Sequence, residues 1–144
     1  MTDLAMPRPA LLLPLRWLGL LIVMASSPSH AQPAIACHTE QARHDRLDVR
    51  CPWPADAPRL RFEAHFAGSH DDTTATLVAT VNGTPLTCAA GSKTSIDGQD
   101  EGDVTLTCTL TAPPLARGAT HVRFELRWHH ARYGGFAVRV EPGG

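Results

Sequence analysis

The sequence is short of basic residues and of long apolar runs, and each shortage excludes a class of protein. Its 144 residues include 13 Lys and Arg against 14 Asp and Glu, a formal net charge of −1 at pH 7. Nucleic-acid-binding domains usually carry a clear basic excess, so we expect no nucleic-acid partner. The main apolar run ends at Ala25, and even when counted back to Ala10 it has only 16 residues. A membrane-spanning helix needs about 20, so we do not expect a membrane anchor.

Motifs of catalysis are also missing. The sequence has no Gly-x-Ser-x-Gly, the motif around the nucleophile of many hydrolases. Ser69, His70 and Asp71 are consecutive, but a catalytic triad needs side chains that converge in space, which neighbours on a turn rarely do. We therefore predict a non-enzymatic protein without a cofactor. A small enzyme or an enzyme inhibitor is kept as a third hypothesis, which an activity screen would reveal.

The N-terminal segment has the features of a signal peptide. Arg8 and Arg16 supply positive charge, the apolar run follows, and Ser-His-Ala at 29–31 forms a small-x-small cleavage site before Gln32. The protein would then be periplasmic or secreted, with no membrane span after cleavage. The expected organisation is a signal peptide over 1–31, an irregular N-terminal arm over 32–46 and a single domain over 47–144.

Lipidation at Cys37 is an alternative, because residues 34–37 (Ala-Ile-Ala-Cys) loosely resemble a lipobox. A lipobox cysteine follows its apolar run closely, whereas Cys37 lies 12 residues beyond Ala25. Lipidation would also leave an odd number of cysteines. Cleavage before Gln32 leaves 113 residues with 11 basic and 13 acidic side chains, a net charge of about −2. That length suits one domain with a modest core.

All four cysteines lie beyond the signal peptide: Cys37, Cys51, Cys88 and Cys108. An even number in an exported chain predicts two disulfides formed in an oxidising compartment. Of the three connectivities, we favour Cys37–Cys51 and Cys88–Cys108. Cys88 and Cys108 fall at inward-facing positions on either side of one loop, and the other pair would tie the N-terminal arm to the first strand. A metal site is disfavoured because there is no Cys-x-x-Cys pair.

Alternation of apolar and polar residues predicts β-strands along the chain. The clearest case is 121–128, where every second residue is a large apolar one: Val122, Phe124, Leu126 and Trp128. A period of two places these side chains on one face of a strand and the charged ones on the other. Seven strands are expected, over 47–51, 59–66, 75–81, 84–88, 104–110, 121–128 and 136–140. We expect no helix of useful length.

Two hairpins are predicted. Asn82-Gly83 favours a type I′ turn, which needs positive φ at both central residues, and Pro85 places the returning strand at a sheet edge. This turn pairs Val81 with Thr84, Ala79 with Leu86 and Leu77 with Cys88. A second hairpin with a turn near 133–135 (Tyr-Gly-Gly) pairs Leu126 with Val138, Phe124 with Val140, Glu125 with Arg139 and Arg123 with Glu141. Both outer pairs join opposite charges, which supports this register.

The segment from Asp103 to Val140 resembles the final strands of bacterial immunoglobulin-like or fibronectin-type domains. It contains a strand, the loop Pro-Leu-Ala-Arg-Gly at 114–118, and a long strand followed by the predicted hairpin. The resemblance covers about a third of the mature chain. It implies an all-β fold, an antiparallel two-sheet immunoglobulin-like sandwich of about seven strands, here stapled by two disulfides. Unlike the antibody pattern, no cysteine lies on the strand 121–128, and the resemblance leaves function open.

Seven histidines follow the signal peptide: His38, His44, His65, His70, His121, His129 and His130. No His-x-His or His-x-x-x-His spacing occurs among them. His121 and His129 share a strand face but lie about 26 Å apart, too far to bind one metal ion. We therefore commit to no metal site. A periplasmic copper- or zinc-handling protein that uses surface histidines is the alternative function.

Two further motifs have ordinary explanations. Residues 97–103 (Asp-Gly-Gln-Asp-Glu-Gly-Asp) hold four carboxylates, the ligands that calcium prefers, but their order does not match an EF-hand. A solvated acidic turn is the commoner case. Residues 82–84 (Asn-Gly-Thr) fit a glycosylation sequon, but the hairpin turn already accounts for Asn82.

The leading hypothesis is an exported module that binds a protein or a cell-envelope partner. It depends on the missing catalytic motifs and on a mixed-charge strand face. The candidate binding residues are Arg123, Glu125, Arg127 and Arg139.

Overall fold

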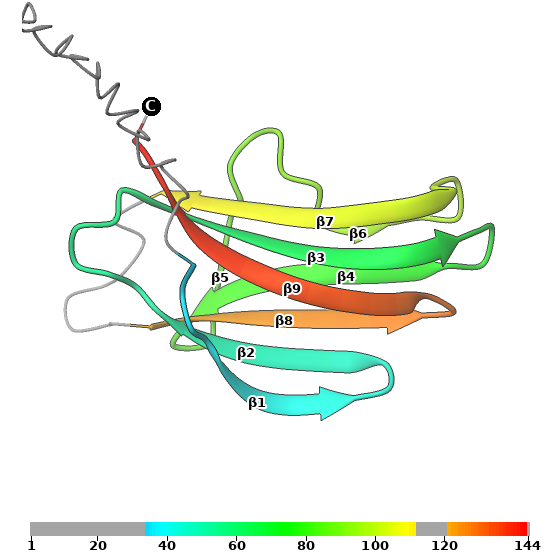
Figure 1. Ribbon diagram of the computed structural model, residues 1–144, viewed down its shortest axis with the longest axis horizontal. Coiled ribbons are helices and arrows are strands. Elements are labelled where there is room, and N and C mark those ends of the chain that lie inside the picture. The colour runs from blue at the N-terminus through cyan, green and yellow to red at the C-terminus, as the bar shows by residue number, and fades with distance from the viewer. Residues whose placement is uncertain (1–33, 112–120, 144) are drawn as a thin grey trace, which may run out of the picture. The chain divides into compact units, whose positions relative to one another are not determined.

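The computed structural model describes residues 34–111 and 121–143, and in these ranges the chain forms nine β-strands and no helix (Figure 1). The strands are β1 (His38–Arg43), β2 (Arg46–Pro52), β3 (Arg59–Ser69), β4 (Thr74–Val81), β5 (Thr84–Leu86), β6 (Ser95–Ile96), β7 (Gly102–Thr111), β8 (His121–His129) and β9 (Arg132–Glu141). The prediction of an all-β, antiparallel, two-sheet sandwich is confirmed. The part of the chain that the structure describes contains no helix long and apolar enough to cross a membrane.

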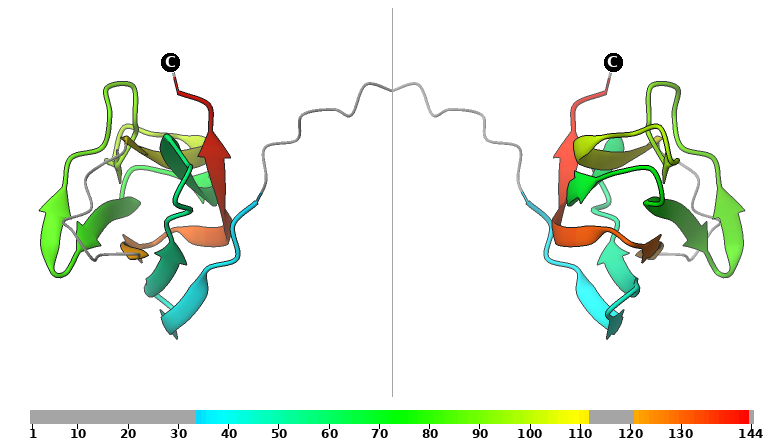
Figure 2. Two further views of the ribbon diagram at one scale, coloured as in Figure 1. Left: turned by 90° about the vertical axis from the view of Figure 1, so that its left-hand side faces the viewer. Right: turned by 90° about the vertical axis from the view of Figure 1, so that its right-hand side faces the viewer.

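The strands form a larger and a smaller sheet. The six-stranded sheet has the order β1-β2-β8-β4-β5, with β6 paired to β4, and the three-stranded sheet has the order β7-β3-β9. In the end-on views of Figure 2, the strands of the three-stranded sheet lie on one side and β1, β2 and β8 lie on the other. Every strand pair is antiparallel.

The core lies between the two sheets and is made by the inward residues of the alternating strands. Phe62 of β3 stacks on Phe124 of β8 across the sandwich, with ring centroids 4.5 Å apart. Near one end of the core, Trp128 stacks on Tyr133 at 5.1 Å. Burial of each large apolar side chain stabilises the fold by about 1.5–3 kcal/mol. The buried side chains that fill the centre are Leu60, Phe62, Phe66, Leu106, Leu110, Phe124 and Leu126.

The hairpin at Asn82-Gly83 forms in the predicted register as far as Leu86. Both turn residues have positive φ, 49° and 77°, and Val81 pairs with Thr84 as Ala79 pairs with Leu86. β5 is an edge strand, as Pro85 indicated. The predicted pairing of Leu77 with Cys88 is wrong. β5 ends at Leu86, and the amide of Leu77 donates instead to the carbonyl of Thr94 at 2.8 Å.

The second predicted hairpin is wrong, because β8 and β9 belong to different sheets. β8 lies between β2 and β4, whereas β9 pairs with β3. The apolar faces of β8 and β9 therefore meet across the core instead of lying side by side. The chain reverses at His130, where φ is 52°. The glycine pair at 134–135 lies within β9, opposite the register shift between His65 and Phe66, so it forms a bulge and not the turn.

The arm predicted to be irregular over 32–46 contains β1, so that prediction is wrong. All six residues of β1 are exposed, and the strand therefore has no apolar alternation that sequence reasoning could detect. It is held by its pairing with β2. Just before it, the amide of Ile35 donates to the carbonyl of Val138 in β9 at 2.9 Å, so the chain crosses from one sheet to the other between Ile35 and β1.

Both predicted disulfides are confirmed. Cys37–Cys51 lies where the chain crosses between the sheets and fastens the start of β1 to β2. Cys88–Cys108 fastens the segment that follows β5 to β7. That segment also covers β7, because the amide of Ala89 donates to the carbonyl of Thr109 at 2.7 Å. No free cysteine is found among the described residues.

Candidate functional site

The outward side chains of β2 and β8 form a ladder of charges on the six-stranded sheet. In the register of the two strands, Arg46 lies opposite Arg127, Asp48 opposite Glu125 and Arg50 opposite Arg123. Like charges directly opposite each other destabilise a sheet. The side chains avoid this conflict by pairing diagonally and along each strand, so that every carboxylate lies between guanidinium groups.

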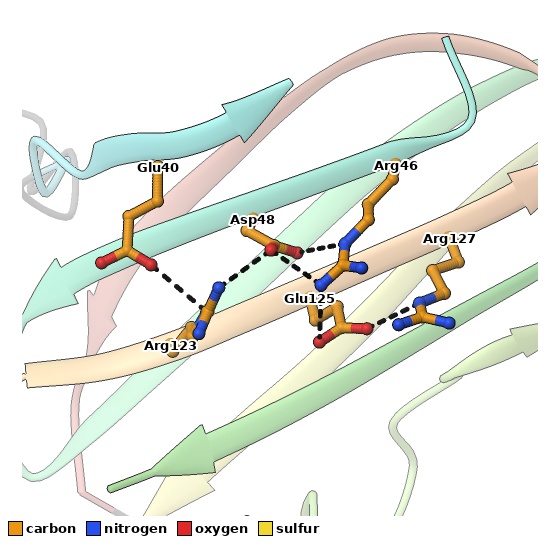
Figure 3. A network of polar contacts seen from close by, with 6 residues as sticks. All are labelled: Glu40, Arg46, Asp48, Arg123, Glu125 and Arg127. Atoms are coloured by element: carbon orange, nitrogen blue, oxygen red, sulfur yellow. Dashed lines mark hydrogen bonds and ion pairs between the residues drawn. The ribbon is translucent and has the colours of Figure 1, made fainter. Parts of the chain in front are cut away.

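The contacts of this network are centred on Asp48 (Figure 3). Arg46 donates to both carboxylate oxygens of Asp48, from Nε at 3.2 Å and from Nη2 at 3.0 Å. Arg123 donates from Nη2 to Oδ2 of the same carboxylate at 2.9 Å. Glu125 contacts Arg46 at 3.5 Å and accepts a hydrogen bond from Nε of Arg127 at 2.6 Å. Glu40, the extra residue at the register shift in β1, completes the network through Arg123 at 3.3 Å.

Burial within the network differs most between Asp48 and the two outer arginines. The side chain of Asp48 is fully buried, whereas the side chains of Arg123 and Arg127 are 44% and 60% exposed. A buried carboxylate is tolerated when opposite charges and hydrogen bonds compensate it. The hydrogen bond to Asp48 raises the pKa of Arg46, so this guanidinium stays charged. The face therefore presents Arg123 and Arg127 most openly to solvent, above the buried carboxylate of Asp48, whereas Arg46, Glu40 and Glu125 are half-buried.

Three of the four predicted binding residues come together on this face, and the fourth does not. Arg123, Glu125 and Arg127 belong to the network, but Arg139 lies on β9 of the other sheet, opposite Arg61. The predicted pairing of Glu141 with Arg123 is replaced by an ion pair with Arg61 at 3.7 Å. Arg139 would share this face only if β8 and β9 were neighbours, and they lie in different sheets.

Sequence reasoning missed Arg46, Asp48 and Glu40. Asp48 alternates with Leu47 and Val49 and so reads as an ordinary solvent-facing residue. Its burial depends on arginines from β2 and from β8, which is 75 residues away in the sequence. A charged residue in a short apolar strand, with arginine two positions before it, is the one local signal that was available.

A shallow depression continues this face at the end of β8. It has a volume of about 180 Å³ and is lined by Thr74, Ala75, Thr76, Arg127, Trp128 and His129. Thr76 lies opposite Arg127 and Thr74 lies opposite His129 across the β4–β8 pair. Four polar side chains from two strands thus surround one small space.

The histidines are dispersed except at one end of the sandwich. There the carboxylate of Asp72 bridges Nδ1 of His70 and Nδ1 of His130, the second at 2.6 Å, and the ring of His130 stacks on His129 at 3.8 Å. Desolvation raises the pKa of Asp72, but the hydrogen bond from His130 and the charges of both histidines lower it by more, so the net shift is downward. Among the described residues no three or more His, Cys, Asp or Glu side chains are grouped to hold a metal ion.

The remaining candidates have structural roles. Ser69 is buried while His70 and Asp71 are exposed, so these three residues do not assemble as a triad. In the acidic loop, Asp97 accepts from the amide of Gln99 at 3.0 Å and Asp100 binds Lys93 at 3.0 Å. The hydrogen bond from Lys93 lowers the pKa of Asp100. These carboxylates cap a turn and pair with lysine.

No protein-family model matches the sequence, and no curated protein is similar to it. A carbohydrate-binding module of lichenase 5A from Cellvibrio mixtus, solved in complex with cellotriose, is similar to 78% of this chain over 90% of its own length. The two share 15% sequence identity, with a TM-score of 0.30. The similarity is too low for the ligand of that module to be carried over to this chain.

Proposed function

We propose that this protein is an exported, non-enzymatic module that binds an anionic component of the cell envelope. The binding surface is the outer face, by which we mean the outward side chains of β2, β8 and β4. The observation that carries the proposal is the network around Asp48, in which a fully buried carboxylate fixes Arg46 and Arg123 at the surface.

A fixed arginine binds at a lower entropic cost than a mobile one. Ordering a long side chain at an interface costs about 0.5–1.5 kcal/mol, and here much of that ordering has occurred within the fold. Arginine also matches carboxylate and phosphate groups with two parallel hydrogen bonds, which a lysine does not do. The outer face is therefore preorganised for a partner with such groups.

The sign of the partner's charge follows from which groups are outermost. Arg50 is exposed and forms no ion pair with a described residue, and it lies opposite Arg123. Val78, 43% exposed, lies opposite Glu125 on the neighbouring strand and adds an apolar contact in the middle of the face. An anionic partner with some apolar surface complements this pattern.

Export is supported by the two disulfides, because such bonds persist mainly in oxidising compartments. The segment 1–31, which carries the expected signal peptide, lies outside the described residues. Location and cleavage remain predictions that mass analysis of the exported protein would test.

The experiment compares two variants in sedimentation with isolated envelope fractions. Arg50→Ala/Arg127→Ala removes two outer guanidinium groups and leaves all contacts of Asp48 in place. Arg132→Ala/Arg139→Ala removes two exposed arginines from β9 of the opposite sheet and is the matched control. We expect the double variant to bind about tenfold more weakly, because exposed charge contacts contribute about 0.2–1 kcal/mol each and partly desolvated ones contribute more.

The control should bind as the wild type does, and wild-type binding should weaken as salt rises. Equal binding by all three proteins would overturn the assignment of the surface. Absence of binding to any envelope fraction, or binding only to a soluble acidic protein, would overturn the proposed partner.

A further inference from the structure

The depression at the end of the outer face has the chemistry of a small anion site. Its four polar side chains occupy facing positions on adjacent strands, with Thr76 opposite Arg127 and Thr74 opposite His129. Facing residues lie about 5 Å apart across a strand pair, and alternate residues lie about 7 Å apart along a strand. The four side chains therefore mark the corners of a space that one small polyatomic ion would fill.

The hydrogen-bonding groups around this space are unused. Arg127 donates to Glu125 through Nε (Figure 3), and its guanidinium forms no other hydrogen bond or ion pair with the described residues, so its terminal nitrogens are left for another acceptor. The hydroxyl groups of Thr74 and Thr76 and the ring nitrogens of His129 have no hydrogen-bond partner among the described residues. Nearby groups differ in this respect, because Thr73 donates from Oγ1 to the carbonyl of His130 at 3.0 Å and His130 binds Asp72.

The lining contains donors and no carboxylate. Its six residues are Thr74, Ala75, Thr76, Arg127, Trp128 and His129. A guanidinium with two hydroxyl groups and an imidazole favours an acceptor-rich, negatively charged ligand. A volume of about 180 Å³ admits a single carboxylate, phosphate or sulfate group, but is below the roughly 300–1,000 Å³ of sites for drug-sized ligands.

We propose that the depression formed by Thr74, Thr76, Arg127 and His129 is an oxyanion subsite, which binds one carboxylate, phosphate or sulfate group. The assignment of that group to the envelope partner rests on the function proposed above, but the subsite itself does not. It would fix the position of one charged group of a larger ligand, while the rest of the outer face contacts the remainder. Arg127 acts in both, as part of the network and as the charged wall of the subsite.

The test uses inorganic phosphate, sulfate and acetate as probes in separate titrations of the isotopically labelled exported protein, followed by NMR. We expect saturable shifts of the backbone amides at 74–76 and 127–129, and of the Arg127 side-chain Nε–H. Because the site is open to water, half-saturation in the millimolar range is expected. Shifts that are absent, or that rise linearly without saturation at these residues, would overturn the subsite.

Variants with matched controls make the test specific. Arg127→Gln should weaken phosphate binding by tenfold or more, because hydrogen bonds to charged groups contribute about 1.5–3 kcal/mol. Thr74→Val/Thr76→Val keeps the shape of both side chains and should weaken binding by about threefold to tenfold. Arg139→Gln on β9 and Thr84→Val on β5 carry the same changes elsewhere and should leave phosphate binding unchanged. Equal effects from the two sets would contradict the assignment.

A second experiment distinguishes a lipid phosphate from a polymer carboxylate as the source of the oxyanion. Vesicles of neutral lipid with and without phosphatidic acid, and a soluble polycarboxylate, are offered to the wild type and to Arg127→Gln. Binding that depends on phosphatidic acid and on Arg127 identifies a lipid phosphate, whereas binding to the polycarboxylate alone identifies a carboxylated polymer.

If free phosphate binds and neither larger ligand does, the subsite stands and the envelope function fails. If envelope binding is lost in Arg50→Ala/Arg127→Ala but free anions never bind, the function stands and the subsite fails.

Discussion

At the scale of single residues, the carboxylate of Asp48 determines how the outer face is held. It is fully buried and has guanidinium groups from β2 and β8 on either side. Removal of its charge would leave Arg46 and Arg123 close together without the group that separates them. The residue therefore links stability to the geometry of the surface.

We predict that Asp48→Asn lowers the free energy of unfolding by about 2–3 kcal/mol, because the three charge-assisted hydrogen bonds from Arg46 and Arg123 are lost or weakened at a buried position. Urea unfolding followed by tryptophan fluorescence measures the change. Asp56→Asn, at an exposed position in the loop before β3, is the control and should change stability by less than about 0.5 kcal/mol. A similar loss in both variants would contradict a special role for Asp48.

Asp72 gives a prediction for the dependence of stability on pH. Its pKa lies below the ordinary value of 3.8 because His130 and His70 outweigh desolvation. A carboxyl with a lowered folded-state pKa stabilises the fold above its unfolded pKa, and this contribution disappears as the pH falls through the folded value. The urea midpoints of the wild type and of Asp72→Asn should therefore differ at pH 6 and converge as the pH falls below about 3.8. Parallel profiles from pH 6 to pH 3 would show that Asp72 does not contribute.

At the scale of strands, the sequence predicted seven of the nine extended segments and their apolar faces, but it predicted neither β1 nor β6 and not all of the strand partners. Alternation places Phe124 and Val138 inward whether their strands are side by side or opposed across the core. The charges of Glu125 and Arg139 agreed with a hairpin by coincidence, and no local pattern separates the two arrangements. The turn at Asn82-Gly83 was predictable because its backbone geometry demands those residue types.

The order of the strands also explains why the candidate surface was only partly predictable. Arg123, Glu125 and Arg127 belong to one strand, so their common face follows from alternation. Asp48 joins them because β2 and β8 are neighbours, which depends on the whole strand order. β1 has six exposed residues and carries no apolar pattern at all, so neither the strand nor the contact of Glu40 with Arg123 could be inferred.

The disulfide Cys37–Cys51 supports a prediction about β1. Since no side chain of β1 is buried, its pairing with β2 depends strongly on this bond and on the contact of Glu40. In Cys37→Ala/Cys51→Ala we expect faster hydrogen exchange at the amides of β1, with an overall loss of at most about 3 kcal/mol for a bond that closes 14 residues. Cys88→Ala/Cys108→Ala should leave β1 protected. Unchanged exchange in the first variant would show that β1 is held by its backbone pairing alone.

At the scale of the whole molecule, stability depends on contact between the two sheets at Phe62 and Phe124. Phe124 belongs to the central strand of the larger sheet and Phe62 to the central strand of the smaller one. The outer face is thus the reverse side of the strand that fills the core. Any change that moves β8 would affect packing and binding together.

We expect Phe124→Ala to lower the free energy of unfolding by about 3–5 kcal/mol, a large part of the 5–15 kcal/mol typical of a domain. Thermal unfolding measures the loss. Val78→Ala, on the outer face of the adjacent strand, should change stability by less than about 0.5 kcal/mol. A small effect at Phe124 would mean that the two sheets are held mainly elsewhere.

The position of β8 has a consequence for the order in which the molecule is assembled. β2 and β4 never touch each other in the larger sheet, because β8 stands between them. A nascent chain that emerges N-terminus first must leave one edge of β2 and one edge of β4 unpaired until β8, in the last sixth of the sequence, has been delivered. Closure of the sheet is therefore a late insertion event, and a polypeptide truncated before residue 121 would keep two open edges. Such a fragment would be a target for proteases. It would also lack Arg123 and Arg127, and so could not form the network around Asp48.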